Sequence, residues 1–245
     1  MRVVRLTHGP GNGVDKACLM TASNMLIGRG EDYDDNACVC PVLRQFIIYT
    51  NDNMPIELLE ELYTPLVWEI LGTRNNKVLQ LRVFAFVDWS CREVLPICLE
   101  SAGLHSEAEI CRGLSPITNK KTAKDAAITI SDAVSDADII GTLGTIGVGN
   151  SIAKVVNSAT SAATSAANVA TRVASNTNAA STVLSTANVA INTASIATIA
   201  GVEADKIWRM CPEIIRRVAA IGDKRPVECV ITHDQLCDAL EGRAG

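Results

Sequence analysis

The chain has 245 residues, enough for one large domain or two modest ones. Its net charge of −5 at pH 7 disfavours nucleic-acid binding, which rests on a basic surface that replaces phosphate counterions. No apolar run reaches the roughly 18 residues of a membrane helix, and nine cysteines without a secretory signal predict reduced thiols and a cytoplasmic protein.

The N-terminal part is expected to hold the conventional core, because eight of the nine aromatic residues lie between Tyr33 and Trp89. Apolar residues at helical spacing, with Gly and Pro between the runs, predict a helical domain over residues 1–119. Its expected helices cover residues 15–27, a run that begins at Pro41, and residues 55–71, 77–101 and 106–113.

Capping and helix-breaking residues define the expected ends of two of these helices. Asn53 is the expected N-cap of the helix over 55–71, and Gly72 its C-terminal stop. In the helix over 77–101, Val78, Leu81, Val83, Phe84, Val87, Val94 and Leu95 should face inward. Pro96 is expected to kink or divide this helix, and Gly103 to end it.

The middle of the chain, residues 120–202, contains a segment of unusual composition. Residues 151–200 hold 15 Ala, 8 Ser, 8 Thr and 6 Asn, with neither Gly nor Pro. Steps of four and three residues from Ile152 reach 14 positions, of which 12 are Ala, Val, Ile or Leu. This repeat favours a helix over a β-solenoid, which needs tight corners.

A mostly alanine stripe on this helix is the predicted interaction surface, because small side chains let helices approach closely. Its residues are Ala159, Ala163, Ala166, Ala170, Val173, Ala180, Leu184, Ala187, Ile191 and Ala194. The segment either folds back near residues 176–178 as a hairpin within a bundle, or pairs with copies of itself as a coiled coil. The hairpin or bundle is the favoured arrangement.

Two further stretches complete the organisation. Four glycines between Ile139 and Gly149 predict a hinge or a close helix crossing, and membrane insertion through residues 139–148 is the alternative. Residues 203–245 form a small C-terminal helical unit: an amphipathic helix over 203–221, an extended run over 226–231, and a last helix that opens with a capping box from Thr232 to Gln235.

No group of residues predicts catalysis, a cofactor or a metal. The glycine-rich loop from His8 to Gly13 lacks the order of a phosphate-binding loop. The cysteines lack the paired spacing of zinc ligands, so Cys91 and Cys98 are expected in the core. An enzymatic or ligand-binding site in the N-terminal head is the alternative, built from Asp15, Lys16, Cys18 and Asp52.

Several short motifs resemble those of a group of uncharacterised bacterial and bacteriophage proteins. The group shares a Lys-x-Cys-Leu-Met opening, an Asn-Asp-x-Met-Pro turn, an alanine-rich helical middle and a short tail with a Pro-Val-Glu run. The matching stretches here cover residues 15–20, 38–43, 51–55, 71–73 and 226–231. This chain departs from the group in its Ser, Thr and Asn-rich middle. The group has no known activity, so the resemblance implies a phage relationship and no function.

Taken together, the sequence predicts an all-α protein with a helical N-terminal head, long Ala/Ser/Thr-rich helices packed as a hairpin, bundle or coiled coil, and a small C-terminal helical unit. Without a catalytic constellation, the expected function is structural, through contacts with copies of itself or with another protein.

Overall fold

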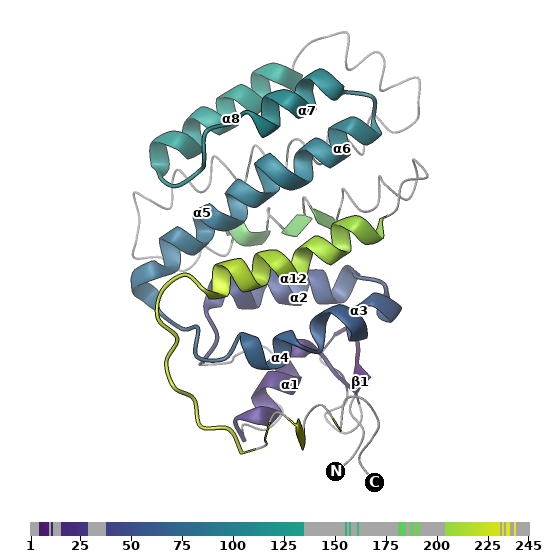
Figure 1. Cartoon of the computed structure of the whole chain (residues 1–245), viewed down its shortest axis with the longest axis vertical. Helices are drawn as coiled ribbons and strands as arrows, with labels where there is room; N and C mark the ends of the chain where they lie inside the picture. The colour runs from purple at the N-terminus through teal and green to yellow at the C-terminus, as the bar shows by residue number, and fades with distance from the viewer. Residues whose placement is uncertain are drawn as a thin grey trace. The chain divides into compact units, whose positions relative to one another are not determined.

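The computed structural model describes residues 5–9, 11, 16–28, 38–134, 155, 157, 161, 181–184, 187–188, 190–191, 204–230, 232, 234–235 and 238. Helix dominates these residues, as predicted (Figure 1). The chain divides into two compact units: Met1–Val78 with Cys211–Gly245, and Leu79–Met210. This division differs from the three compositional regions, whose boundaries at 119 and 202 stay a prediction.

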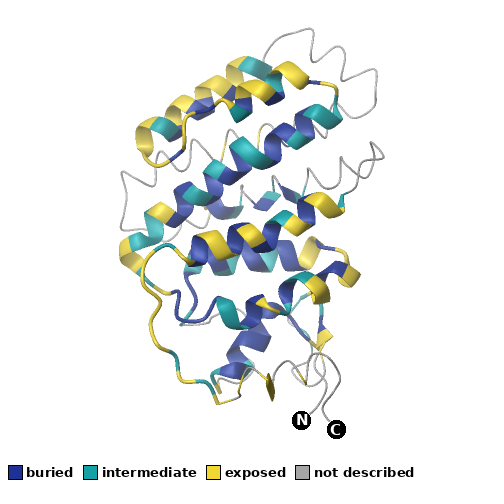
Figure 2. Cartoon of the chain, viewed as in Figure 1, coloured by how far each residue is buried: buried dark blue, intermediate teal, exposed yellow. Residues whose placement is uncertain are grey.

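The first unit contains two short strands and most of the head helices. Strands β1 (Arg5–Leu6) and β2 (Lys16–Ala17) pair in parallel, with Arg5 opposite Lys16. Helix α1 (Leu19–Leu26) packs against α2 (Pro41–Asn53), α4 (Leu66–Glu69) and β2. Figure 2 shows α1 almost wholly in the colour of buried residues, so this helix is the centre of the unit's core.

Helix boundaries in the head differ from the prediction at two points. The helix expected over 55–71 is two helices, α3 (Ile56–Tyr63) and α4, because Pro65 has no N–H to continue the hydrogen-bond ladder. The N-cap assigned to Asn53 is wrong, since Asn53 is the last residue of α2 and its side chain donates to the Tyr49 carbonyl oxygen (2.8 Å). The predicted stop at Gly72 is confirmed by its φ of 73°.

In the second unit the predicted long helix is divided near Pro96. After the short 3₁₀-helix η1 (Asn76–Val78), which ends the first unit's N-terminal part, the chain forms α5 (Leu79–Trp89), the π-helical turn η2 (Ser90–Val94) and α6 (Leu95–Ser101). In the π turn the Leu95 N–H bonds the Ser90 carbonyl oxygen, five residues back. The break lies where Pro96 removes a helical donor.

The inward face expected for this stretch is largely correct. Five of the seven residues are buried: Val83, Phe84, Val87, Val94 and Leu95. Leu81 is 52% exposed and Val78 is half-buried, so the inward assignment is wrong for these two. Both lie at the start of the stretch, Val78 in η1 and Leu81 in the first turn of α5.

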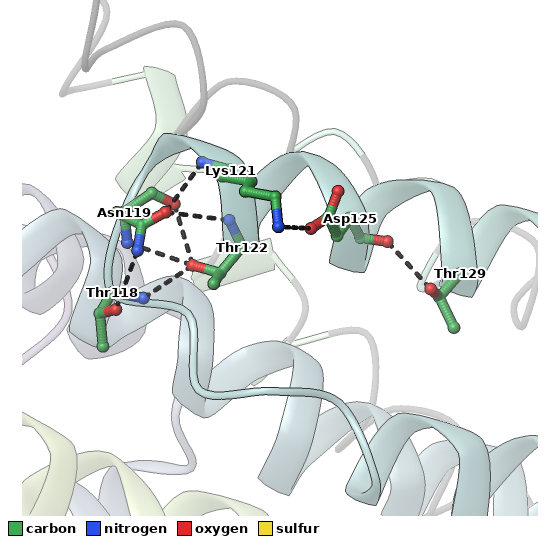
Figure 3. A network of polar contacts seen from close by, with 6 residues as sticks. All are labelled: Thr118, Asn119, Lys121, Thr122, Asp125 and Thr129. Carbon is green, nitrogen blue, oxygen red and sulfur yellow. Dashed lines mark hydrogen bonds and ion pairs between the residues drawn. The ribbon is translucent and has the colours of Figure 1, made fainter.

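Helices α7 (His105–Arg112) and α8 (Lys120–Val134) pack against each other in the same unit. A side-chain network holds the start of α8 (Figure 3). The Asn119 Oδ1 accepts hydrogen bonds from the backbone N–H groups of Lys121 (2.9 Å) and Thr122 (3.1 Å), and Thr122 Oγ1 accepts from Asn119 N (3.2 Å). These bonds satisfy the first donors of the helix, so the network is an N-cap.

The described residues of the central segment are helical, as predicted: residues 155, 157, 161, 181–184, 187–188 and 190–191. Of the predicted interaction stripe, Ala187 is fully buried, while Leu184 and Ile191 are half-buried. The other stripe residues lie outside the described residues: Ala159, Ala163, Ala166, Ala170, Val173, Ala180 and Ala194. The proposed hinge or membrane-inserting segment over 139–148 also lies outside them.

The C-terminal part begins with α12 (Asp205–Ala219), whose Ile207, Trp208, Ile214, Ile215 and Val218 are buried as the amphipathic pattern predicts. Residues 223–229 follow without helix or strand, so the run predicted to be extended over 226–231 forms no strand at its described residues 226–230. The predicted capping box is confirmed: Thr232 Oγ1 accepts from Gln235 N (3.2 Å), and Gln235 Oε1 from Thr232 N (2.9 Å).

Candidate functional site

A small hollow in the head is the best candidate for a site, because it gathers two of the residues singled out from the sequence. It lies where the N-terminal loop meets the start of α1 and the last turns of α2, and its volume is about 90 Å³. Its lining residues are Gly9, Cys18, Leu19, Met20, Ile47, Ile48, Asn51 and Asp52.

Asn51 and Asp52 hold the N-terminal loop over this hollow. The Asn51 amide nitrogen donates to the Thr7 carbonyl oxygen (2.9 Å), and its oxygen accepts from the backbone N–H of Leu19 (3.4 Å). Asp52 Oδ1 accepts from the backbone N–H of Gly9 (2.8 Å). Two neighbouring residues at the end of α2 therefore fasten both the loop and the start of α1, an arrangement we call the Asn51–Asp52 clamp.

The loop itself depends on glycine and on one histidine. Gly9 and Gly11 have φ values of 63° and 79°, which side chains with a β-carbon rarely adopt. A β-carbon at Gly11 would overlap the Lys16 carbonyl oxygen. His8 Nε2 donates to the Met54 carbonyl oxygen (2.7 Å), beside the clamp. Hydrogen bonds at Thr7, His8 and Gly9 thus hold the described part of this loop to the end of α2.

Cys18 is the N-cap of α1 and is only 6% exposed. Its sulfur accepts from the backbone N–H of Thr21 (3.4 Å) and lies 3.3 Å from the Thr21 hydroxyl oxygen. The helix predicted from residue 15 starts later, because Lys16 and Ala17 pair with β1 instead. The thiol therefore satisfies a helix-terminal donor, which is a structural role.

Two of the four residues of the alternative site meet at the hollow. Cys18 and Asp52 line the hollow, whereas Lys16 is exposed on β2 and is not among the lining residues. Asp15 lies outside the described residues. The sequence pattern placed Asn51 only in a turn. Nothing in the Asn-Asp pair itself predicted the contact of Asn51 with Thr7.

The size and chemistry of the hollow argue against catalysis there. Ligand pockets usually measure roughly 300–1,000 Å³, so about 90 Å³ accommodates a few waters rather than a substrate. Among the described residues that line the hollow, none is a His or Lys that could serve as a base to the Cys18 thiol. The clamp binds the chain's own backbone.

The remaining buried cysteines are core residues, as predicted for Cys91 and Cys98, both of which are 0% exposed. Burial raises the pKa of Cys91 to about 12 and that of Cys111 to about 11, so both thiols stay protonated and unreactive at neutral pH. Within the described ranges, no three His, Cys, Asp or Glu side chains gather as metal ligands.

Comparison of the chain with protein-family models, curated proteins and solved structures found no match. The resemblance to the bacterial and bacteriophage group stays a prediction carried by its short motifs alone. In the part of the chain that the structure describes, no helix is both long and apolar enough to cross a membrane.

Proposed function

We propose that this chain is a non-catalytic structural or protein-interaction protein whose Ala-rich helices pack as a bundle within the chain itself. The observation that carries the proposal is the burial, in a single chain, of several described residues of the central segment. Val155, Val183, Ala187 and Ala190 are all 0% exposed there.

The spacing of the buried positions supports a packed helical face. Residues 183, 187 and 190 are four and three residues apart, so they share one side of a helix, and each is completely covered. Only Ala187 belongs to the predicted stripe, because residues 183 and 190 each precede a stripe position by one residue. In a coiled coil between copies, the seam of an isolated chain would be open to solvent. Burial of these positions within one chain therefore favours the hairpin or bundle, with alanine allowing close contact between helices.

The head supports a non-catalytic role independently. The clamp residues bond to backbone groups of their own chain, and the Cys18 thiol caps α1. The net charge of −5 disfavours nucleic acid, so the partner we propose is another protein. The motif resemblance adds the proposal that this partner belongs to a bacteriophage or its host.

Two substitutions of equal size test the bundle. Ala187→Leu adds volume at a fully buried site, and Ser161→Leu adds it at an exposed helical site. Overpacking costs roughly 1–3 kcal/mol in a close-packed core, so we expect Ala187→Leu to lower the Tm clearly and Ser161→Leu to leave it nearly unchanged. Light scattering behind size exclusion should give a helical monomer for the wild type and both variants.

Protein concentration separates the two arrangements. An intramolecular bundle melts at the same temperature over a roughly hundredfold range of concentration, whereas an oligomer melts at higher temperature as concentration rises. An oligomer that becomes monomeric when residues 151–200 are deleted would contradict the bundle and establish the segment as an assembly element. Equal destabilisation by both leucine variants would contradict the assigned buried face.

A further inference from the structure

Two segments of the first unit that are far apart in sequence, residues 69–78 and 213–225, lie side by side. The Arg216 guanidinium donates to the Glu69 carboxylate through Nε (2.7 Å) and Nη2 (3.1 Å). The Lys224 ammonium donates to the backbone carbonyl oxygen of the same Glu69 (2.6 Å). Two cations from the second segment therefore contact a single residue of the first.

Two further contacts extend the junction between these segments. The Arg225 N–H donates to the Gly72 carbonyl oxygen (2.8 Å). The Val78 side chain packs against Gly222 so closely that a β-carbon at Gly222 would lie 2.9 Å from Val78 Cγ1. Contacts thus join the two segments along the whole length from Glu69 to Val78, so the charged residues of both segments belong to one surface.

This surface is basic, although the chain as a whole is acidic. The two segments hold six Lys or Arg and three Asp or Glu, a net charge of +3, which leaves −8 on the rest of the chain. All six cationic residues are exposed (Figure 2). We call them the basic surface: Arg74, Lys77, Arg216, Arg217, Lys224 and Arg225.

Three of these cations lack a carboxylate partner among the described residues: Lys77, Lys224 and Arg225. The bond of Lys224 goes to a carbonyl oxygen, which carries no net charge, and Arg225 is held through its backbone N–H. Like charges gathered on one surface repel one another, and bound carboxylates relieve that repulsion. The fold therefore presents cations that an anionic partner can neutralise.

We propose that the basic surface binds an acidic segment of a partner protein, in which several Asp or Glu side chains lie close together. The inference rests on the proposed function and deepens it, because it names the chemistry of the partner. Lys and Arg form charge-assisted hydrogen bonds with carboxylates. A short acidic segment touches the basic surface alone, whereas a nucleic acid is a long polyanion that also meets the charge of −8 on the rest of the chain. This difference favours a protein over a nucleic acid.

Fluorescence anisotropy of a short labelled polyglutamate peptide tests the proposal on the full chain, at low salt where surface charges are screened least. The variant Lys77→Gln/Arg225→Gln removes two exposed charges from the basic surface. The control Lys121→Gln/Lys124→Gln removes two exposed charges from α8, in the other unit. Because each exposed ion pair contributes little, we expect the first variant to bind about three- to tenfold more weakly than the wild type, and the control less than about twofold.

A third variant should act in the opposite direction. Glu69→Gln removes the carboxylate that pairs with Arg216 but keeps the carbonyl oxygen that accepts from Lys224, so it should bind the peptide about two- to threefold more tightly than the wild type. The urea midpoint of each variant, compared with that of the wild type, reports that the chain is folded.

Equal affinities of the basic-surface variant and the α8 control would overturn the proposal, and so would a wild type that does not bind polyglutamate. An oligothymidylate of equal charge that binds more tightly than the peptide would assign the surface to nucleic acid and overturn the proposed partner. The helical bundle is judged separately, by the concentration dependence of the Tm. Loss of peptide binding with an unchanged, concentration-independent Tm would therefore reject this inference and leave the bundle in place.

Discussion

Replacing Gly72 by alanine tests how the C-terminal tail, residues 220–230, is held to the head. Gly72 has a φ of 73°, and its carbonyl oxygen accepts the Arg225 N–H at 2.8 Å. A β-carbon at this position would overlap the Arg225 carbonyl oxygen, which belongs to the backbone and cannot rotate away. The variant therefore forces the tail to move, and Lys224, which donates to the Glu69 carbonyl oxygen (2.6 Å), moves with it.

Gly9 provides the matched control for this substitution. It lies in the same unit with a φ of 63°, but a β-carbon there meets nothing within 4 Å. The left-handed conformation costs alanine roughly 1–2 kcal/mol, and the stiffer unfolded chain offsets about 0.4–1 kcal/mol of this. Gly9→Ala should therefore cost about 1 kcal/mol. Gly72→Ala adds the lost Arg225 bond, about 0.5–1.5 kcal/mol, and the displaced packing, for about 2–4 kcal/mol in total.

Urea unfolding followed by far-UV circular dichroism measures both costs. With a slope of about 2 kcal/mol per M, the midpoint for Gly72→Ala should lie roughly 0.5–1.5 M below that for Gly9→Ala. Hydrogen exchange of the Arg225 and Val230 amides should accelerate only in the Gly72 variant, because both amides are tail anchors. Equal midpoints with unchanged exchange would refute the idea that the tail requires a glycine beneath it.

Three further predictions concern the clamp, the α8 cap and a buried thiol. Asn51→Ala leaves buried backbone groups without partners and should cost about 2–3 kcal/mol in urea unfolding, whereas Asn53→Ala, exposed on the same helix, should cost under about 0.5 kcal/mol. Asn119→Ala should lower the free energy of unfolding by about 1 kcal/mol. Asn119→Ser should recover most of this loss, since a hydroxyl caps helices as well. Equal losses in the two variants would contradict the cap. Burial raises the pKa of Cys91 from 9.0 to about 12, so the folded chain keeps a proton that the unfolded chain releases. The free energy of unfolding should be unaffected by this thiol below pH 9 and fall by up to about 1.4 kcal/mol per pH unit between about 9 and 12, and Cys91→Ala should flatten that fall.

Much of the helical structure could be predicted because its signals are local. Gly103 and Pro96 fall where the chain stops or breaks its helix, and the Thr232 capping box forms both of its hydrogen bonds. The amphipathic pattern of α12 depends on 3.6-residue spacing, which needs no knowledge of the partner that covers it. Helix existence and buried faces were therefore accessible from residue order alone.

The incorrect predictions lie where two local sequence signals compete, or where the sequence carries no local signal. Pro65 falls within an apolar pattern of helical spacing, and its missing N–H divides the pattern into two helices. Strands β1 and β2 have two residues each, too few for a period of two to show. The clamp joins Asn51 to Thr7 across 44 residues, and no short-range pattern encodes such a contact.

The same limit explains why composition does not indicate that two distant parts of the chain form the first unit. The first unit is assembled from Met1–Val78 and Cys211–Gly245, with 132 residues of the second unit between them in sequence, from Leu79 to Met210. Tyr63 of α3 bonds Thr50 of α2. Burial raises the pKa of Tyr63, and the thiol of Cys211 in α12 raises it further. Residues of α12 therefore contribute to the core of the first unit.

Because the first unit is discontinuous in sequence, the tail contributes to the stability of the head. Long loops add only about 0.6 kcal/mol of closure entropy for each doubling of length, so a few well-placed contacts suffice to hold the ends together. Those contacts are backbone bonds at Gly72 and Leu26, with Gly28 leaving room for the Val230 side chain above it.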